Sequence, residues 1–291
     1  EADGIYKPVY AVKSLPGAVF EIRAAEDIYT LDGVMHYAKG EIVDTITTES
    51  DGVASSKELY LGKYKIREIT APHGMVLNGT IQTVELTYAG QEVAITETAD
   101  NLYNERQKVK VSLSKVLEQN DLFGIGMNGE LKNITFGLYA KTDLVAGDGT
   151  VIPAGGLIEI VTFDDNGMAT VSTDLPLGSY YLQERSTDEH YILDDTHYEF
   201  EFSYGSQETQ VVEISVNDGV PIQNDLKYGM VSGRKVDEDG HVIAGAIFGL
   251  FRNDENEYTA ENAYLTAESA QDGTFKFEKV PFGTWVVREI Q

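Results

Sequence analysis

Short runs of alternating apolar and polar residues dominate the chain, and turn residues separate them. Residues 111–115 (VSLSK) alternate strictly, and β-branched and aromatic residues cluster in residues 19–22 and 64–66. A period of two predicts β-strands, because successive side chains of a strand point to opposite faces of the sheet. No stretch shows a capped apolar pattern with the period of a helix. The pattern therefore predicts an all-β chain of many short strands, as in β-sandwiches.

Two sequence blocks recur three times in the same order. The earlier block is centred on a phenylalanine and occupies residues 17–22, 133–138 and 245–250. The later block has a glycine, an aromatic residue two positions on, and a glutamate six positions after the glycine; it occupies residues 61–68, 177–184 and 282–289. Between the blocks lies an Asp-Gly or Asn-Gly pair, a dipeptide that favours hairpin turns because it tolerates positive φ.

The repeats predict three domains in tandem. Polar stretches at residues 105–108 and 225–228 precede fresh strands, so we place the domains at residues 1–106, 107–226 and 227–291. The second domain carries insertions at residues 119–130 and 146–156. The third domain stops two residues after its block glutamate, and we expect it to lack its last strands.

Composition and charge limit the classes of partner and site that the chain can have. The chain has 48 acidic and 22 basic residues, a net charge of −26, and no cysteine. This charge disfavours nucleic acid and anionic membranes as partners, and favours a monomer with a solvated exterior. The absence of cysteine excludes disulfides and thiolate zinc sites. The acidic turns at residues 164–167 and 237–240 lack the ligand spacing of an EF-hand, so we expect no metal site and no cofactor.

Taken together, the repeats resemble the Cna B-type domains, which are SpaA-like, transthyretin-like β-sandwiches of Gram-positive surface proteins and pilins. The resemblance rests on a lysine in a first strand, the two blocks, residues 70–74 (TAPHG) after the first glutamate, and an asparagine in a last strand. It covers essentially the whole chain. It implies tandem transthyretin-like or immunoglobulin-like sandwiches, the third incomplete, with isopeptide bonds that form spontaneously between lysine and asparagine and are promoted by the glutamate.

The implied chemistry also follows from physical principles. A lysine with a pKa near 10.4 is protonated at neutral pH and is no nucleophile. Burial disfavours the charged forms of both an amine and a carboxyl group, so a buried lysine beside a buried glutamate tends toward a neutral pair. The amine can then attack the asparagine carbonyl while the carboxyl group carries protons to the departing ammonia. Neighbouring strands supply the effective concentration that the reaction needs.

The second and third domains supply candidates by their position in the repeat. The second domain has Lys115 at the end of an alternating strand, with Glu184 and Asn224. The third has Lys235 and Glu289, with no asparagine after them. A single lysine or glutamate on a strand is usually just solvated. The recurrence of the glutamate at the same offset in all three repeats favours a role in bond formation.

The first domain has Glu68 and Asn104, and two lysines compete for its third position. Lys13 ends a predicted strand at residues 10–13, whereas Lys7 has the same spacing to the following block as Lys235 has in the third domain. Both lysines have the same strand parity, so the alternation does not decide between them. Lys13 is preferred, because Pro8 would disturb a paired strand beside Lys7.

The leading functional hypothesis is a structural stalk segment of a Gram-positive cell-wall-anchored surface protein, either an adhesin or a pilin-like protein. It implies an extracellular, cell-surface location with the anchor outside this segment, no membrane contact within it, and no enzymatic activity except self-catalysed isopeptide formation. No clear pilin-motif lysine is found, which favours a single-chain stalk over a polymer. The alternative is an adhesive module that binds a host matrix protein or glycan through the insertions of the second domain.

Overall fold

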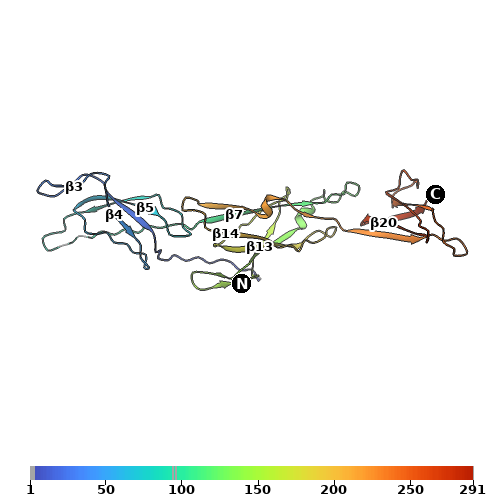
Figure 1. Cartoon of the computed structure of the whole chain (residues 1–291), viewed down its shortest axis with the longest axis horizontal. Coiled ribbons are helices and arrows are strands. Elements are labelled where there is room, and N and C mark those ends of the chain that lie inside the picture. Colours follow the sequence, from blue (N-terminus) through green and yellow to red (C-terminus); the bar gives the residue numbers. More distant parts are fainter. Residues whose placement is uncertain (1–3, 94, 96, 291) are drawn as a thin grey trace.

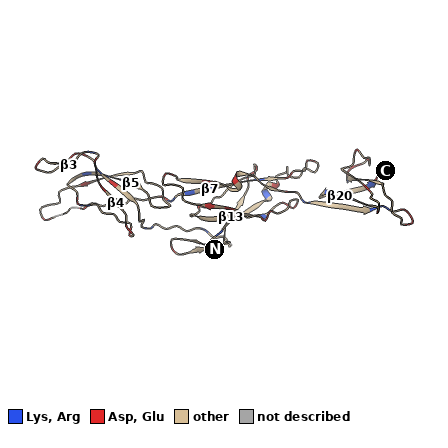
Figure 2. Ribbon diagram, in the orientation of Figure 1, with Lys and Arg blue, Asp and Glu red and all other residues tan. Residues whose placement is uncertain are grey.

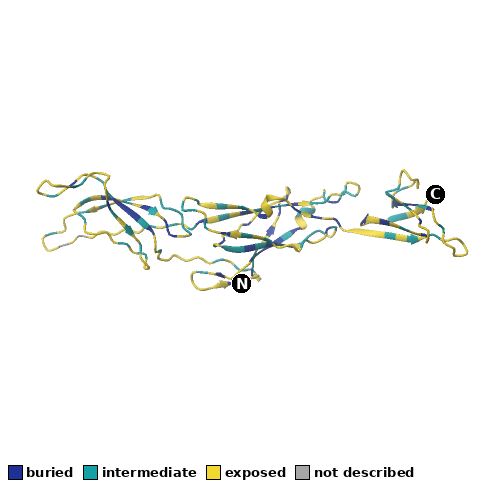
Figure 3. Ribbon diagram, viewed as in Figure 1, coloured by how far each residue is buried: buried dark blue, intermediate teal, exposed yellow. Residues whose placement is uncertain are grey.

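The strands form three groups that follow one another along an elongated molecule (Figure 1). The computed structural model describes residues 4–93, 95 and 97–290. Two boundaries separate the groups, one between residues 106 and 107 and one between residues 226 and 227. Among the described residues, no strand on one side of a boundary pairs with a strand on the other side. Buried residues occur along the strands of each group and in some of the segments that connect them (Figure 3). The predicted all-β class, with prealbumin-like domains repeated along the chain, is confirmed.

The first domain is built on a single four-stranded sheet in the order β4-β1-β5-β6. Its strands are β1 (Val19–Ala24), β4 (Ile42–Thr47), β5 (Gly62–Thr70) and β6 (Ile81–Leu86), and β2 (Ile28–Tyr29) pairs with β3 (Met35–Tyr37). One face of the sheet carries a small apolar core around Ile22, Val43 and Tyr64.

The second domain is a sandwich of two sheets. One sheet has the order β11-β8-β13-β14, with β8 (Thr135–Ala140), β11 (Leu157–Thr162), β13 (Gly178–Ser186) and β14 (Tyr198–Phe202). The other has the order β12-β7-β15, with β16 also paired to β7, and its strands are β7 (Lys108–Leu117), β12 (Met168–Thr170), β15 (Val211–Ser215) and β16 (Ile222–Asn224). Leu113, Phe136 and Leu182 from the two sheets share one buried core, as the alternation of apolar residues requires.

Smaller elements complete the second domain. The strands β9 (Leu144–Val145) and β10 (Val151–Ile152) form a hairpin that begins just before the insertion at residues 146–156 and extends into it. The short 3-10 helices are η1 (Glu130–Asn133) and η2 (Val216–Gly219). Strand β16 follows η2 and runs parallel to β7, with Ile222 opposite Lys115.

The third domain contains two small sheets. Strand β17 (Tyr228–Arg234) pairs with β20 (Thr274–Pro281), and β18 (Ile247–Arg252) lies between β19 (Leu265–Glu268) and β21 (Trp285–Glu289). The described residues hold no counterparts of β15 and β16. Strand β17 is accordingly mostly exposed.

The two recurring sequence blocks pair with each other in every domain. The earlier block forms β1, β8 and β18, and the later block forms β5, β13 and β21. In each pair of strands the block phenylalanine lies opposite the block glutamate, as Phe20 with Glu68, Phe136 with Glu184 and Phe248 with Glu289. The repeat therefore encodes a strand register that places one glutamate at the same point of each domain.

The N-terminal segment, residues 5–13, differs from expectation because it is not a strand of the first domain. It runs beside the second domain instead (Figure 1). The backbone N–H of Tyr6 donates to the carbonyl of Leu157 at 2.7 Å, and the Tyr10 hydroxyl donates to the carbonyl of Asp174 at 2.8 Å. The guanidinium of Arg106 lies 3.5 Å from the centre of the Tyr10 ring. The hydrogen bonds to Leu157 and Asp174 hold the segment on the second domain, so the strand predicted at residues 10–13 is corrected.

Side chains also join consecutive domains. At the first joint, the side chain of Gln207 accepts a hydrogen bond from the Ala71 N–H at 2.9 Å and donates to the carbonyl of Ile69. At the second joint, the ring of Phe123 packs edge-on against Trp285 at 5.2 Å between centres. The Tyr228 hydroxyl there donates to the Glu118 carboxylate at 2.7 Å.

Candidate cross-linking site

Three side chains predicted from the repeat meet inside the second domain. Lys115 of β7, Glu184 of β13 and Asn224 of β16 are 1%, 3% and 1% exposed. The Lys115 Nζ lies 3.3 Å from Glu184 Oε1, and the Asn224 Nδ2 donates to Glu184 Oε2 at 2.9 Å. A single carboxylate thus lies between an amine and an amide, with one oxygen beside each nitrogen.

Local sequence explains how these residues reach the same point. The alternation in β7 turns Val111, Leu113 and Lys115 toward the core, where they are all buried. The pairing of β13 with β8 sets Glu184 opposite Phe136, whose ring centre lies 5.5 Å from the Lys115 Nζ. The parallel pairing of β16 with β7 then brings Asn224 to the same end of β7.

The site contains unusually many unsatisfied polar atoms. In the described part of the chain, four buried side-chain atoms lack a hydrogen-bond partner, and three of them are Lys115 Nζ, Glu184 Oε1 and Asn224 Oδ1. The Nζ and Oε1 atoms are close enough for an ion pair but are not aligned as a hydrogen bond. Leaving such atoms buried and unpaired is costly. A reaction that joins the amine to the amide carbonyl would remove much of this cost.

Burial lowers the pKa of the Lys115 amine, because desolvation penalises the ammonium form. The negative charges of Glu184 and, more weakly, Asp194 act in the opposite direction. The net effect is a lowered pKa, which favours the neutral, nucleophilic form of the Lys115 amine.

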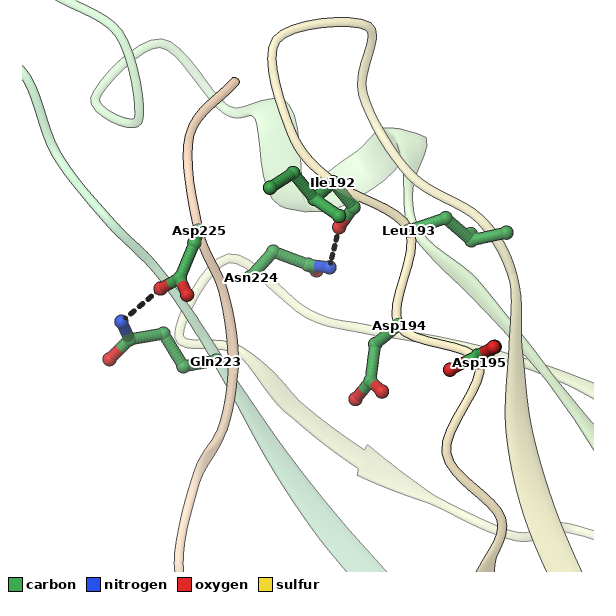
Figure 4. Close-up of a pocket in the computed structure, with 7 residues that line it drawn as sticks. All are labelled: Ile192, Leu193, Asp194, Asp195, Gln223, Asn224 and Asp225. Atoms are coloured by element: carbon green, nitrogen blue, oxygen red, sulfur yellow. Dashed lines mark hydrogen bonds between the residues drawn. The ribbon is translucent and has the colours of Figure 1, made fainter. Parts of the chain in front are cut away.

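A backbone segment holds the other two groups. The carbonyl of Ile192 accepts a second hydrogen bond from the Asn224 Nδ2 at 2.6 Å (Figure 4). The backbone N–H of Asp194 donates to Glu184 Oε2 at 2.7 Å. Beside them is a cavity of about 210 Å³, lined by Ile192, Leu193, Asp194, Asp195, Gln223, Asn224 and Asp225.

The first domain brings its glutamate and asparagine together without a lysine. The Asn104 Nδ2 donates to both oxygens of Glu68, at 2.9 and 2.7 Å, and Glu68 is 3% exposed. The Lys13 side chain instead donates to the carbonyl of Gly147 in the second domain, and Lys7 is exposed on the N-terminal segment. Among the described residues, no lysine forms an ion pair with Glu68. The expected grouping of Lys13 or Lys7 with this pair is therefore corrected, because the N-terminal segment is held on the second domain.

The third domain brings its lysine and glutamate together without an asparagine. The Lys235 Nζ lies 2.7 Å from Glu289 Oε2, and the two side chains are 26% and 43% exposed. No asparagine side chain bonds Glu289 in the part of the chain that the structure describes. This pair is more exposed than the pair in the second domain, and a surface ion pair of this kind contributes little to stability.

The segment that holds the glutamate and the asparagine was missed in the sequence analysis. It has a counterpart in the first domain, where the Asn78 N–H donates to Glu68 Oε2 at 2.6 Å and the carbonyl of Val76 accepts from the Asn104 Nδ2 at 3.0 Å. The signal is present in the sequence as residues 76–80 (VLNGT) and 192–196 (ILDDT). In both domains the Asn or Asp lies ten residues after the glutamate.

The described residues hold neither a metal-binding cluster nor a helix that could span a membrane. They contain no group of three or more His, Cys, Asp or Glu side chains that could hold a metal ion. None of their helices has the length and apolar character needed to cross a membrane. Acidic and basic residues occur along the length of the molecule (Figure 2).

The recurring strand pair and the sheet topology define a chain of repeated prealbumin-like β domains. The chain belongs to the SpaA family of prealbumin-like fold domains, whose profile matches residues 9–100, 125–219 and 229–291. The resemblance inferred from the sequence is thus confirmed. Among curated proteins, none shows a significant match.

Several solved structures match this chain at low sequence identity. The Bacillus anthracis TIE protein is 21% identical with a TM-score of 0.60, and the match covers 99% of this chain and 44% of that one. The chain therefore spans less than half of that protein. BcpA, the major pilin subunit of Bacillus cereus, is 16% identical over 98% of this chain and 86% of its own, with a TM-score of 0.34. A streptococcal ancillary pilin is 20% identical over 96% and 85%, with a TM-score of 0.29.

Proposed function

We propose that residues 1–106, 107–226 and 227–291 are consecutive domains of a stalk segment in a Gram-positive cell-wall-anchored surface protein, either an adhesin or a pilin-like protein. Membership of the SpaA family supports this role and an extracellular location. The elongated arrangement and the side-chain contacts at both joints also support it. The segment acts as a monomer and takes no cofactor.

The second domain is stabilised by an isopeptide bond between Lys115 and Asn224. The ammonium of Lys115 first passes a proton to Glu184, and the neutral amine then attacks the Asn224 side-chain carbonyl carbon. A bond forms from Nζ to Cγ, the bond from Cγ to Nδ2 breaks, and Nδ2 leaves as ammonia. Glu184 carries the proton from the attacking nitrogen to the leaving nitrogen, so no outside reagent is consumed.

One observation carries this proposal: the Glu184 carboxylate lies between the two nitrogens, 3.3 Å from one and 2.9 Å from the other. Buried groups held at such distances need little further ordering before they react. The bond is confined to the second domain, because among the described residues a lysine, a glutamate and an asparagine meet only there.

Intact-mass spectrometry of the denatured chain tests the bond. Release of one ammonia should lower the mass by about 17 Da from the calculated value. The Glu184→Ala variant should have its full calculated mass, since it cannot relay the proton. The Glu201→Ala variant, which alters an exposed glutamate of β14, should keep the deficit. Wild-type protein at its full calculated mass would refute the proposed bond.

The adhesive alternative assigned ligand binding to the insertions of the second domain. In the insertion at residues 119–130, Phe123 packs against Trp285 and Tyr264 of the third domain. Its largest apolar side chain is thus engaged within the molecule. This contact supports a role for the insertion in holding the second and third domains together. We therefore favour the stalk over a module that binds a host matrix protein or glycan.

A further inference from the structure

The segments that hold the glutamate and the asparagine have the same construction in two domains. In each, one backbone carbonyl accepts from the asparagine amide, and the N–H two residues later donates to the glutamate. In the second domain these groups belong to Ile192 and Asp194, and in the first domain to Val76 and Asn78. A chance contact would not recur with the same two partners in domains that differ at most positions.

Both segments are fixed by an Asx turn. The Asp194 Oδ1 accepts from the Thr196 N–H at 3.0 Å, and the Asn78 Oδ1 accepts from the Thr80 N–H at 2.9 Å. This turn fixes the backbone locally, without help from a β-ladder. Asp194 is further anchored by the Tyr198 hydroxyl, which donates to its Oδ2 at 2.5 Å. The side chain of Asp194 therefore determines where its own backbone N–H points.

The consequence for the reacting groups is specific. Both hydrogens of the Asn224 amide are engaged, one by Glu184 Oε2 and one by the Ile192 carbonyl. Glu184 Oε2 is held by the amide and by the Asp194 N–H, while Oε1 is left open toward the Lys115 Nζ. The amide cannot turn, and the carboxylate cannot rotate away from the amine.

We propose that Asp194 is a positioning residue for isopeptide formation, acting through the Ile192–Asp194 segment to hold the leaving amide and the proton-relaying carboxyl group in register. This inference rests on the bond proposed above. Asp194 touches none of the bonds that form or break. Its effect is to keep Asn224 and Glu184 in the geometry from which Lys115 attacks, a contribution that misplacement by about 1 Å can reduce a hundredfold.

The charge of Asp194 has a second, separable effect. The charged groups acting on Lys115 are Glu184, in contact with it, and Asp194. The Asp194 carboxylate stabilises the ammonium form and so raises the pKa of Lys115 against the lowering by burial. Replacing Asp194 by Asn, the residue that the first domain has here, keeps the Asx turn but removes this charge. The amine should then become neutral, and react, at lower pH.

The test is a time course of bond formation in the full chain. Freshly synthesised chain from a cell-free system is quenched in acidic denaturant at intervals, and the fraction lighter by about 17 Da is measured. We expect Asp194→Ala to slow the reaction at least about tenfold. Asp194→Asn keeps the turn, and its Nδ2 can donate to the Tyr198 hydroxyl in place of the present hydrogen bond. It should therefore react no more slowly than wild type at neutral pH, with its pH–rate profile displaced toward acid. Asp148→Ala is the matched control, because Asp148 forms the same turn with Thr150 at 3.0 Å on an exposed loop.

The possible outcomes separate the two proposals. A wild-type chain without the mass deficit would overturn both the bond and the role of Asp194. A wild-type chain with the deficit, together with an Asp194→Ala variant as fast as Asp148→Ala, would overturn only the role of Asp194. If Asp194→Ala fails to fold by circular dichroism, Tyr198→Phe removes the anchor with a smaller change. It should slow bond formation several-fold, and an unchanged rate would overturn the positioning role.

Discussion

Replacing Lys115 by methionine should strongly destabilise the second domain. The side chain keeps a similar length, so the core around Leu113 and Phe136 can still pack, but the amine that forms the bond is gone. The bond from Lys115 to Asn224 closes a loop of about 110 residues. Loop-closure reasoning developed for disulfides assigns such a loop about 4.8 kcal/mol of stabilisation, through the entropy lost by the unfolded chain.

This free energy corresponds to a large change in Tm. A domain the size of residues 107–226 has an unfolding entropy of about 0.25 kcal/mol/K, so a loss of about 4.8 kcal/mol should lower Tm by about 15–20 °C. Glu184 would also lose the nitrogen that it faces in the cross-linked domain, and this loss acts in the same direction. Differential scanning calorimetry of the second-domain transition in the full chain would measure the change.

Two variants serve as comparisons. Lys110→Met alters an exposed lysine of the same strand and should leave Tm nearly unchanged. Asn224→Ala prevents the same bond but keeps the Lys115–Glu184 pair, and its Tm should fall by a similar amount to that of Lys115→Met. If the wild-type chain carries the bond and Lys115→Met unfolds within about 5 °C of it, the loop-closure argument is refuted.

Three further predictions concern the N-terminal segment and the second joint. Lys13→Ala should leave the mass deficit at about 17 Da, whereas a wild-type deficit of about 34 Da would show that a second bond forms in the first domain. The hydrogen bond to Glu118 raises the pKa of Tyr228 to about 12. The contribution of this hydrogen bond to the stability of the joint should therefore be complete below about pH 10 and lost as pH rises through about 12. In ultraviolet titration, Tyr228→Phe should show one late-titrating tyrosine fewer than wild type. Phe123→Ala should speed tryptic cleavage between the second and third domains relative to the exposed-site control Leu122→Ala, and equal rates would show that the Phe123 ring does not hold the joint.

Much of the fold could be predicted because the two recurring blocks form paired strands with the same register in each domain. The blocks were expected to be strands, and the structure pairs them so that Phe136 faces Glu184 in the second domain and Phe20 faces Glu68 in the first. Alternation in β7 places Lys115 on the same side of the strand as Val111 and Leu113, and all three are buried. These are local signals, since each depends only on the two-residue period and on a recurring spacing.

The placement of the N-terminal segment could not be predicted in the same way. The choice between Lys13 and Lys7 assumed that residues 10–13 form a strand of the first domain. The segment is instead held by contacts of Tyr6 and Tyr10 with residues more than a hundred positions away. Tertiary contacts of this kind leave no periodic trace in the sequence. The Ile192–Asp194 segment was missed for a different reason. Its repeated pattern is present in the sequence, but the sequence does not show which backbone groups contact the glutamate and the asparagine.

The parallel arrangement of β7 and β16 has a mechanical consequence. The chain enters the second domain at the start of β7 and leaves it directly after β16, and the two strands run side by side in the same direction. With a covalent link from Lys115 to Asn224, a pull on the two ends travels along β7, crosses the link and leaves at residue 225. The residues between would carry no load, although unravelled they would span about 350–390 Å. The extensibility of such a segment would then be set by one short strand and one amide bond, and would not depend on how firmly the sandwich itself is folded.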